Sequence, residues 1–125
     1  MTSATAPTPI EITETLVRLY VFLAQYLDRC VDEAARTSLP EKELQDHLNT
    51  TRSAMMAMVS VNPVVKSKVE KECERVLDIG AACLKGGASK KERLAELEQE
   101  RAALRHKTLA LSDLLAVFRA HAPAP

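Results

Sequence analysis

Three stretches at the start of an apolar helical pattern carry the same signal, a Ser or Thr followed three residues later by Glu. They are Thr8–Glu11, Ser38–Glu41 and Ser89–Glu92. In such a capping box, each side chain binds a backbone N–H that the first helical turn leaves unpaired. A fourth signal is Asn62 followed by Pro63, because proline suits the first helical position. Each signal precedes apolar residues spaced three and four apart, so the sequence predicts four helices.

The apolar period sets the expected bounds of these helices. We predict helices over residues 9–36, 39–60, 63–85 and 90–120. The connections between them are short, which makes consecutive helices antiparallel. We expect disordered tails at residues 1–8 and 122–125, on either side of one helical domain over 9–121. The predicted fold class is all-α, an antiparallel bundle of about four helices with coiled-coil character in the last.

The predicted helices differ in length. At about 1.5 Å per residue, the first and last measure roughly 42–47 Å and the middle two roughly 33–35 Å. The long helices should therefore extend about 10 Å beyond the short ones. Apolar residues on such an overhang are typical of a subunit of a larger assembly.

The last predicted helix carries a heptad pattern. Leu97, Leu104, Leu111 and Phe118 fall seven residues apart at the d position, with Leu94 and Leu115 at a. In a parallel homodimer, the flanking charges would pair Glu100 with Arg105 of a second copy. We interpret the part before residue 105 as a narrow contact with one partner helix. The broader apolar arc over 109–118 predicts cover by the first helix and by a partner.

Met55, Met56 and Met58 form a flexible apolar cluster in the second helix. Such side chains either fill gaps in a core or form an adaptable surface. We expect Met55 and Met58 in the core and Met56 partly exposed. The predicted protein-interaction residues are Leu94, Leu97, Leu104, Leu111, Leu115, Phe118 and Met56.

Composition limits the classes of partner. Lys and Arg total 17 and Asp and Glu total 17, so no overall field attracts nucleic acid, and we expect no direct nucleic-acid binding. No apolar run is long enough to span a membrane, and the first residues lack the pattern of a signal peptide. Cys30, Cys73 and Cys83 lack metal-ligand spacing, so we expect buried thiols in an intracellular compartment, cytoplasmic or nuclear.

The sequence offers little support for catalysis. His47, His106 and His121 lie on separate segments without a second ligand nearby, and we expect them to be solvated. The chain has no glycine-rich phosphate loop and no local basis for an activated nucleophile. We therefore predict no catalytic residues, no metal and no cofactor, and a protein that is not an enzyme.

The layout over residues 9–120 resembles that of small helical subunits of Mediator, of kinetochore complexes and of lysosome-organelle adaptor complexes. These chains assemble with others of their kind, and the resemblance implies no particular functional residue. Our first hypothesis is a non-enzymatic assembly or adaptor subunit that contacts other helical subunits, with a homodimer through 94–118 as one arrangement. The alternative is a self-contained bundle that binds a small apolar ligand or lipid in a cavity near Met55–Met58.

Overall fold

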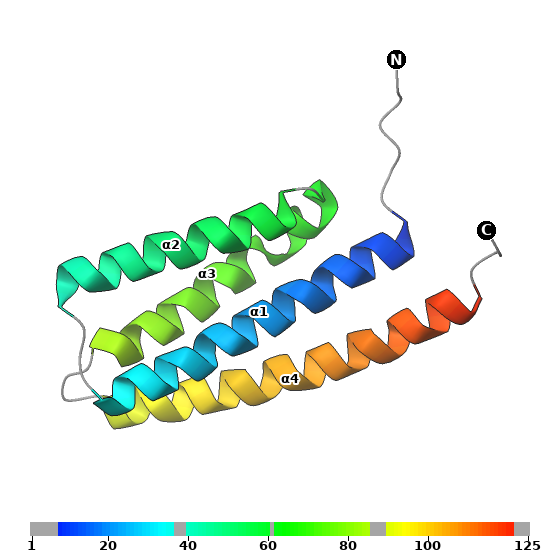
Figure 1. Ribbon diagram of the computed structural model, residues 1–125. Helices are drawn as coiled ribbons and strands as arrows, with labels where there is room; N and C mark the ends of the chain where they lie inside the picture. The colour runs from blue at the N-terminus through cyan, green and yellow to red at the C-terminus, as the bar shows by residue number, and fades with distance from the viewer. Residues whose placement is uncertain (1–7, 37–39, 61, 86–89, 122–125) are drawn as a thin grey trace, which may run out of the picture.

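The computed structural model describes residues 8–36, 40–60, 62–85 and 90–121, and these residues form four α-helices. The helices are α1 (Pro9–Arg36), α2 (Glu41–Val59), α3 (Pro63–Lys85) and α4 (Lys90–Ala120). Consecutive helices run antiparallel, and no described residue lies in a strand (Figure 1). The predicted all-α fold of four helices is confirmed. The tails predicted to be disordered lie outside the described residues, apart from Thr8.

Two of the four predicted helix starts are confirmed at atomic detail. Thr8 and Glu11 form the expected capping box, in which each backbone N–H donates to the other's side chain at 3.1 Å. Asn62 caps α3, because its Oδ1 accepts a hydrogen bond from the Val65 N–H at 3.3 Å. Ser38 and Ser89 lie outside the described residues.

The second helix begins two residues later than predicted. Pro40 occupies the N-cap of α2 and makes no side-chain capping bond, while its carbonyl accepts from the Leu44 N–H at 2.9 Å. The predicted start at Leu39 lies outside the described residues, and the helix begins at Glu41. The helix ends at Val59, one residue earlier than predicted, with Ser60 as its C-cap.

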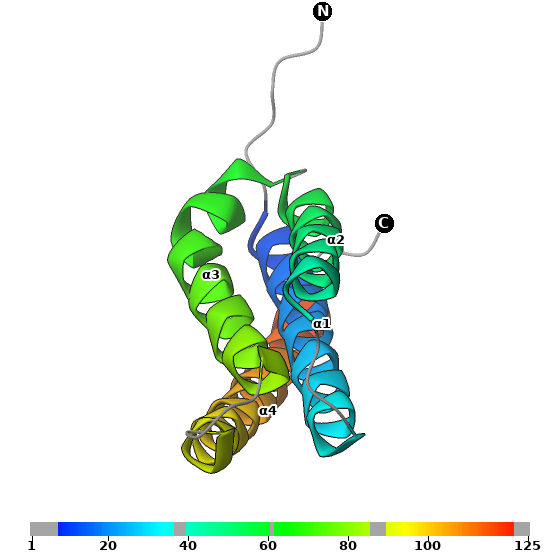
Figure 2. The same cartoon turned by 90° about the vertical axis from the view of Figure 1, so that its left-hand side faces the viewer.

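The bundle is built around α1, which contacts all three other helices. The third helix also contacts each of the others, whereas α2 and α4 do not contact each other within the described residues. Viewed end-on, α2 and α4 lie on opposite sides of the α1–α3 pair (Figure 2). This arrangement leaves α4 covered by only two helices, α1 and α3.

One continuous core fills the space between the helices. Leu19, Leu23 and Leu27 form its centre on α1 and are fully buried. They stand four residues apart, so one stripe of α1 faces inward along this part of the helix. The fully buried core residues from the other helices include Met55, Val59, Cys73, Val76, Leu77, Leu97 and Leu104.

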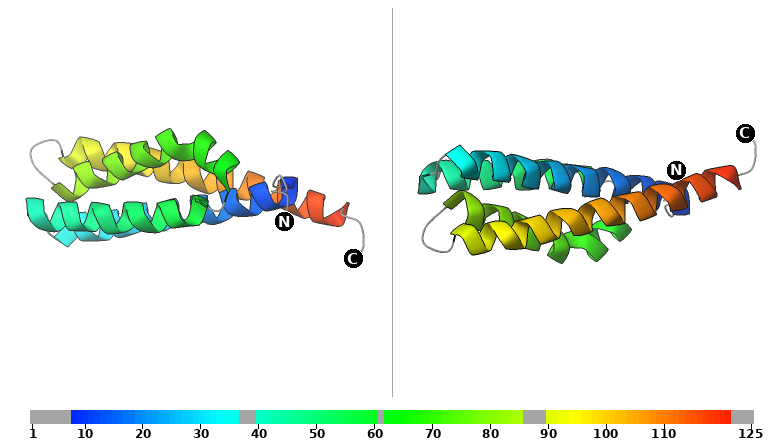
Figure 3. Two further views of the ribbon diagram at one scale, coloured as in Figure 1. Left: turned by 90° about the horizontal axis from the view of Figure 1, so that it is seen from above. Right: turned by 90° about the horizontal axis from the view of Figure 1, so that it is seen from below.

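The long helices extend beyond the short ones at one end of the molecule. The N-terminal end of α1 and the C-terminal end of α4 project together past α2 and α3 (Figures 1 and 3). α1 has 28 residues and α4 has 31, against 19 in α2 and 23 in α3. The predicted overhang is therefore present, and two helices form it.

Candidate interaction surface

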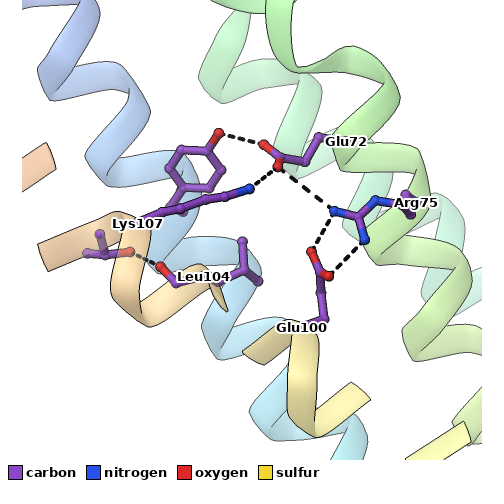
Figure 4. A network of polar contacts seen from close by, with 7 residues as sticks. Glu72, Arg75, Glu100, Leu104 and Lys107 are labelled. Atoms are coloured by element: carbon purple, nitrogen blue, oxygen red, sulfur yellow. Dashed lines mark hydrogen bonds and ion pairs between the residues drawn. The ribbon is translucent and has the colours of Figure 1, made fainter. Parts of the chain in front are cut away.

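A polar network fixes α4 against α1 and α3 in the middle of the bundle. Glu72 on α3 is its centre, with the Tyr20 hydroxyl donating to Oε1 and the Lys107 ammonium donating to Oε2 (Figure 4). Lys107 also lies over the Tyr20 ring, 5.7 Å from its centroid. Burial tends to raise the pKa of Glu72, but these hydrogen bonds outweigh burial and lower it. The carboxylate is therefore held in its charged form.

A second pair extends this network toward the start of α4. Arg75 donates two hydrogen bonds to the Glu100 carboxylate, at 2.7 and 2.8 Å (Figure 4). Glu100 is buried, and a bidentate guanidinium is the partner that best satisfies a buried carboxylate. Arg75 also lies 3.9 Å from Glu72, which links the two carboxylates into one network. The Arg75–Glu100 pair therefore fixes how α3 and α4 align along their length.

The first half of α4 belongs to the chain's own core. Leu97 and Leu104 have no exposed surface within the single chain. We predicted a narrow contact that a partner could reach at these two residues, and the structure contradicts this prediction. The heptad spacing identified the inward face correctly, but α1 and α3 of the same chain cover that face.

The charges that flank this half are also used within the chain. Glu100, which we expected to pair with Arg105 of a second copy, instead binds Arg75. Arg105 lies 3.4 Å from Asp28 of α1, and Arg101 lies 3.1 Å from the same carboxylate. The parallel pairing expected for residues 93–105 would break these contacts.

We call the projecting pair of helix ends the arm, made of residues 9–18 of α1 and 109–120 of α4. Glu14 and Arg119 tie its two helices together with a contact of 2.7 Å. Leu115 is buried, as predicted, whereas Leu111 and Phe118 are only half-buried. The arm therefore has a thin core of its own.

Three large apolar residues of the arm face solvent. Leu109 is 67% exposed, Val117 is 53% exposed and Leu114 is 42% exposed. Several large apolar side chains exposed within nine residues of one helix are typical of a contact surface. None of the three was among the predicted interaction residues, because the heptad frame places them outside the a and d positions.

A shallow apolar hollow lies beside the arm between α1 and α4. Val21, Ala24, Thr108 and Leu109 line it, with a volume of about 330 Å³. The Asp28 ion pairs flank it on one side and the Glu14–Arg119 pair on the other. This hollow extends the exposed apolar surface of the arm toward the middle of the molecule.

The other predicted interaction residues are less accessible. Met56 and Leu94 are half-buried and pack against the core. Met55 is fully buried and Met58 half-buried, as expected for residues that fill the core. Met56 and Leu94 therefore offer only part of their side chains to a partner, and contact with a partner there stays a prediction.

The thiols are buried, whereas the histidines differ in exposure, since His106 and His121 are exposed. The three cysteines are free and buried, and burial raises the pKa of the Cys30 and Cys73 thiols to about 12. His47, which we expected to be solvated, is half-buried and stacks on the Tyr26 ring with 5.7 Å between centroids. Burial lowers the pKa of His47.

Among the described residues, no three His, Cys, Asp or Glu side chains are grouped so that they could hold a metal ion. No described helix is both long enough and apolar enough to cross a membrane.

A wider hollow lies between α3 and α4, with a volume of about 1020 Å³. Carboxylates and cations line it together, including the paired Arg75 and Glu100 and the Arg93–Glu96 contact of 3.7 Å. Charges of both signs that already pair with each other are typical of a solvated face.

Comparison with protein-family models, with curated proteins and with solved structures finds no match to this chain. The arm is the candidate site because large apolar side chains are exposed there.

Proposed function

We propose that this protein is a non-enzymatic assembly subunit that joins other helical protein chains through its arm. One observation carries the proposal, namely that α4 is most apolar where the chain covers it least. Residues 90–107 include ten charged residues in 18 positions, whereas residues 108–120 include only Asp113 and Arg119 in 13. A helix that ends in solvent normally keeps a charged outer face. The reverse pattern favours burial of the arm in an assembled state.

The shape of the molecule supports the same proposal. The body is a bundle with its own core, so the chain can fold before it meets a partner. In the arm, the ends of α1 and α4 project side by side beyond that body (Figure 3). Half-buried Leu111 and Phe118 give a partner a starting surface that exposed Leu114 and Val117 extend. We therefore still propose Leu111, Leu115 and Phe118 as residues that contact a partner.

The alternative of a ligand-binding or lipid-binding bundle has less support. It requires a cavity near the methionines of α2, and Met55 has no exposed surface. Neither the two hollows described above nor a third one beside Arg18 is lined by a methionine. The buried thiols fit a reducing intracellular compartment, cytoplasmic or nuclear, which is part of the proposal.

The test compares two triple variants of the full chain, each tagged and purified from cells of its natural source. The arm variant carries Leu109→Asp, Leu114→Asp and Val117→Asp. The matched control adds the same charges to exposed alanines in the first half of α4, as Ala95→Asp, Ala102→Asp and Ala103→Asp. Circular dichroism first establishes that both variants keep the helicity of the wild type.

We expect the wild type and the control to carry partner chains in fixed stoichiometry and the arm variant to lose them. Charges placed in an apolar contact cost several kcal/mol, which is enough to dissociate a typical complex. Partners that the arm variant retains, or a wild type that carries none, would overturn the proposed function.

A further inference from the structure

The exposed apolar residues of the arm lie on more than one side of α4. Successive helical residues are about 100° apart, which places Val117 about 80° and Leu114 about 140° around the axis from Leu109. A single partner helix contacts only one stripe of another helix. Covering Leu109, Leu114 and Val117 together therefore requires at least two helices.

One uncovered side of α4 lies in line with α3, beyond the point where α3 begins. Glu100 and Lys107 contact α3, and Leu111, Leu114 and Phe118 follow on the same side of α4 at steps of four, three and four. α3 does not extend along the arm (Figures 1 and 3). An incoming helix would lie in line with α3 and contact the same stripe of α4.

The charges of the arm are complementary to those of a second arm. Glu11 has no ion pair among the described residues, but its carboxylate caps the first turn of α1. The other two charged side chains of the arm without an ion pair among the described residues are Arg18 and Asp113, which have opposite signs. Arg18 lines one hollow with Ser112 and Leu115, so it lies close to the level of Asp113 along the arm. A twofold axis at this level would bring Arg18 of each copy toward Asp113 of the other.

Building on the proposed function, we infer that the occupant of the arm is the arm of a second copy, packed antiparallel about a twofold axis. Each arm brings two helices, so two arms form a four-helix bundle that covers α4 on more than one side. A twofold contact is self-complementary, so one Arg18–Asp113 attraction occurs twice. The chain carries 17 positive and 17 negative side chains, so its net charge does not oppose self-association.

The first test is the mass of the purified full chain in solution, measured by sedimentation equilibrium over a range of concentrations. We expect a dimer, at twice the 13.7 kDa of the single chain. The arm variant should be monomeric and the alanine-position control should remain dimeric. Leu114→Asp alone should raise the dimer Kd at least about tenfold.

The second test exchanges the two unpaired charges. Arg18→Asp and Asp113→Arg should each raise the dimer Kd, and the double variant should restore it toward the wild-type value. Both residues are exposed, so helicity should not change. A double variant that is weaker than either single variant would overturn the antiparallel arrangement.

The outcomes separate this inference from the proposed function. A chain that stays monomeric at all concentrations, but binds other chains through the arm in cells, overturns the second copy and leaves the proposed function standing. A monomer that binds no chain overturns both. A dimer that the arm variant retains overturns the assignment of the arm as the dimer contact.

Discussion

The ring of Tyr26 on α1 lies directly over Gly80 on α3. A Cβ atom built on Gly80 would stand 2.5 Å from the Tyr26 hydroxyl oxygen and 2.6–2.7 Å from two ring carbons. The same hydroxyl donates a hydrogen bond to the Leu77 carbonyl at 3.2 Å, which holds the ring in this place. The absence of a side chain at Gly80 therefore makes room for one aromatic side chain at the contact between α1 and α3.

Gly80→Ala should destabilise the protein by about 1–3 kcal/mol, because the added methyl overlaps a ring that a buried hydrogen bond restrains. Alanine favours a helix over glycine by about 1 kcal/mol, so a stabilised variant would show that the ring moves freely. Urea denaturation measures the change. Ser67→Ala, at an exposed position of the same helix, is the control and should lie within about 0.5 kcal/mol of the wild type.

Leu97→Ala should cost about 2–5 kcal/mol, because it leaves a cavity at a side chain with no exposed surface. Leu109→Ala, on the same helix, should change the unfolding free energy of the monomer by no more than about 0.5 kcal/mol. Chemical denaturation of the two variants at concentrations below any association gives the comparison. Equal losses would mean that α4 is covered evenly along its length, contrary to the structure.

The network around Glu72 predicts a dependence of stability on pH. Its pKa is lowered from the ordinary 4.5, so its contribution is fully present above that value and is lost as the pH falls through the folded-state pKa. The unfolding free energy of the wild type should therefore fall on acidification below about pH 4.5, and Glu72→Gln should lack this component. Glu43→Gln, exposed on α2, should keep the wild-type slope. A Glu72→Gln variant with the wild-type slope would contradict the network.

The cysteines should react slowly in the native chain. All three are buried, and burial holds the pKa of two of them near 12, so few thiolates exist at pH 8 and a reagent does not reach them. Labelling by a disulfide reagent at pH 8 should be slower by at least about a hundredfold than in the urea-unfolded chain. A thiol that labels at the unfolded rate without urea would disprove the burial of that residue.

Local signals in the sequence predicted most of the fold. The bounds of α1, α3 and α4 agree with the prediction because capping residues and helical periods act over a few residues. The capping pattern at Ser38–Glu41 predicts a start at Leu39, but α2 begins at Glu41, after Pro40. A proline disfavours the helical conformation in the residue before it, which the capping pattern does not take into account.

The sequence of α4 does not predict which of its residues the other helices bury. The heptad spacing shows that Leu97 and Leu111 share one face, but it does not show which helix covers that face or where the cover ends. That depends on contacts between residues far apart in the chain, such as Asp28 with Arg101 and Arg75 with Glu100. The heptad pattern therefore did not select Leu109, Leu114 and Val117, the large apolar residues that α4 exposes.

The pairing of α1 with α4 also determines the order in which the chain can fold. Glu14 and Arg119 stand 105 positions apart, so their contact forms only after the last turn of α4 has been synthesised. The α2–α3 hairpin closes a short loop and can form early, whereas the ends of α1 and α4 meet across the longest loop in the bundle. During synthesis, the first turns of α1 leave the ribosome with their apolar face uncovered. Apolar surface that stays uncovered until α4 is complete can associate with other chains in the meantime.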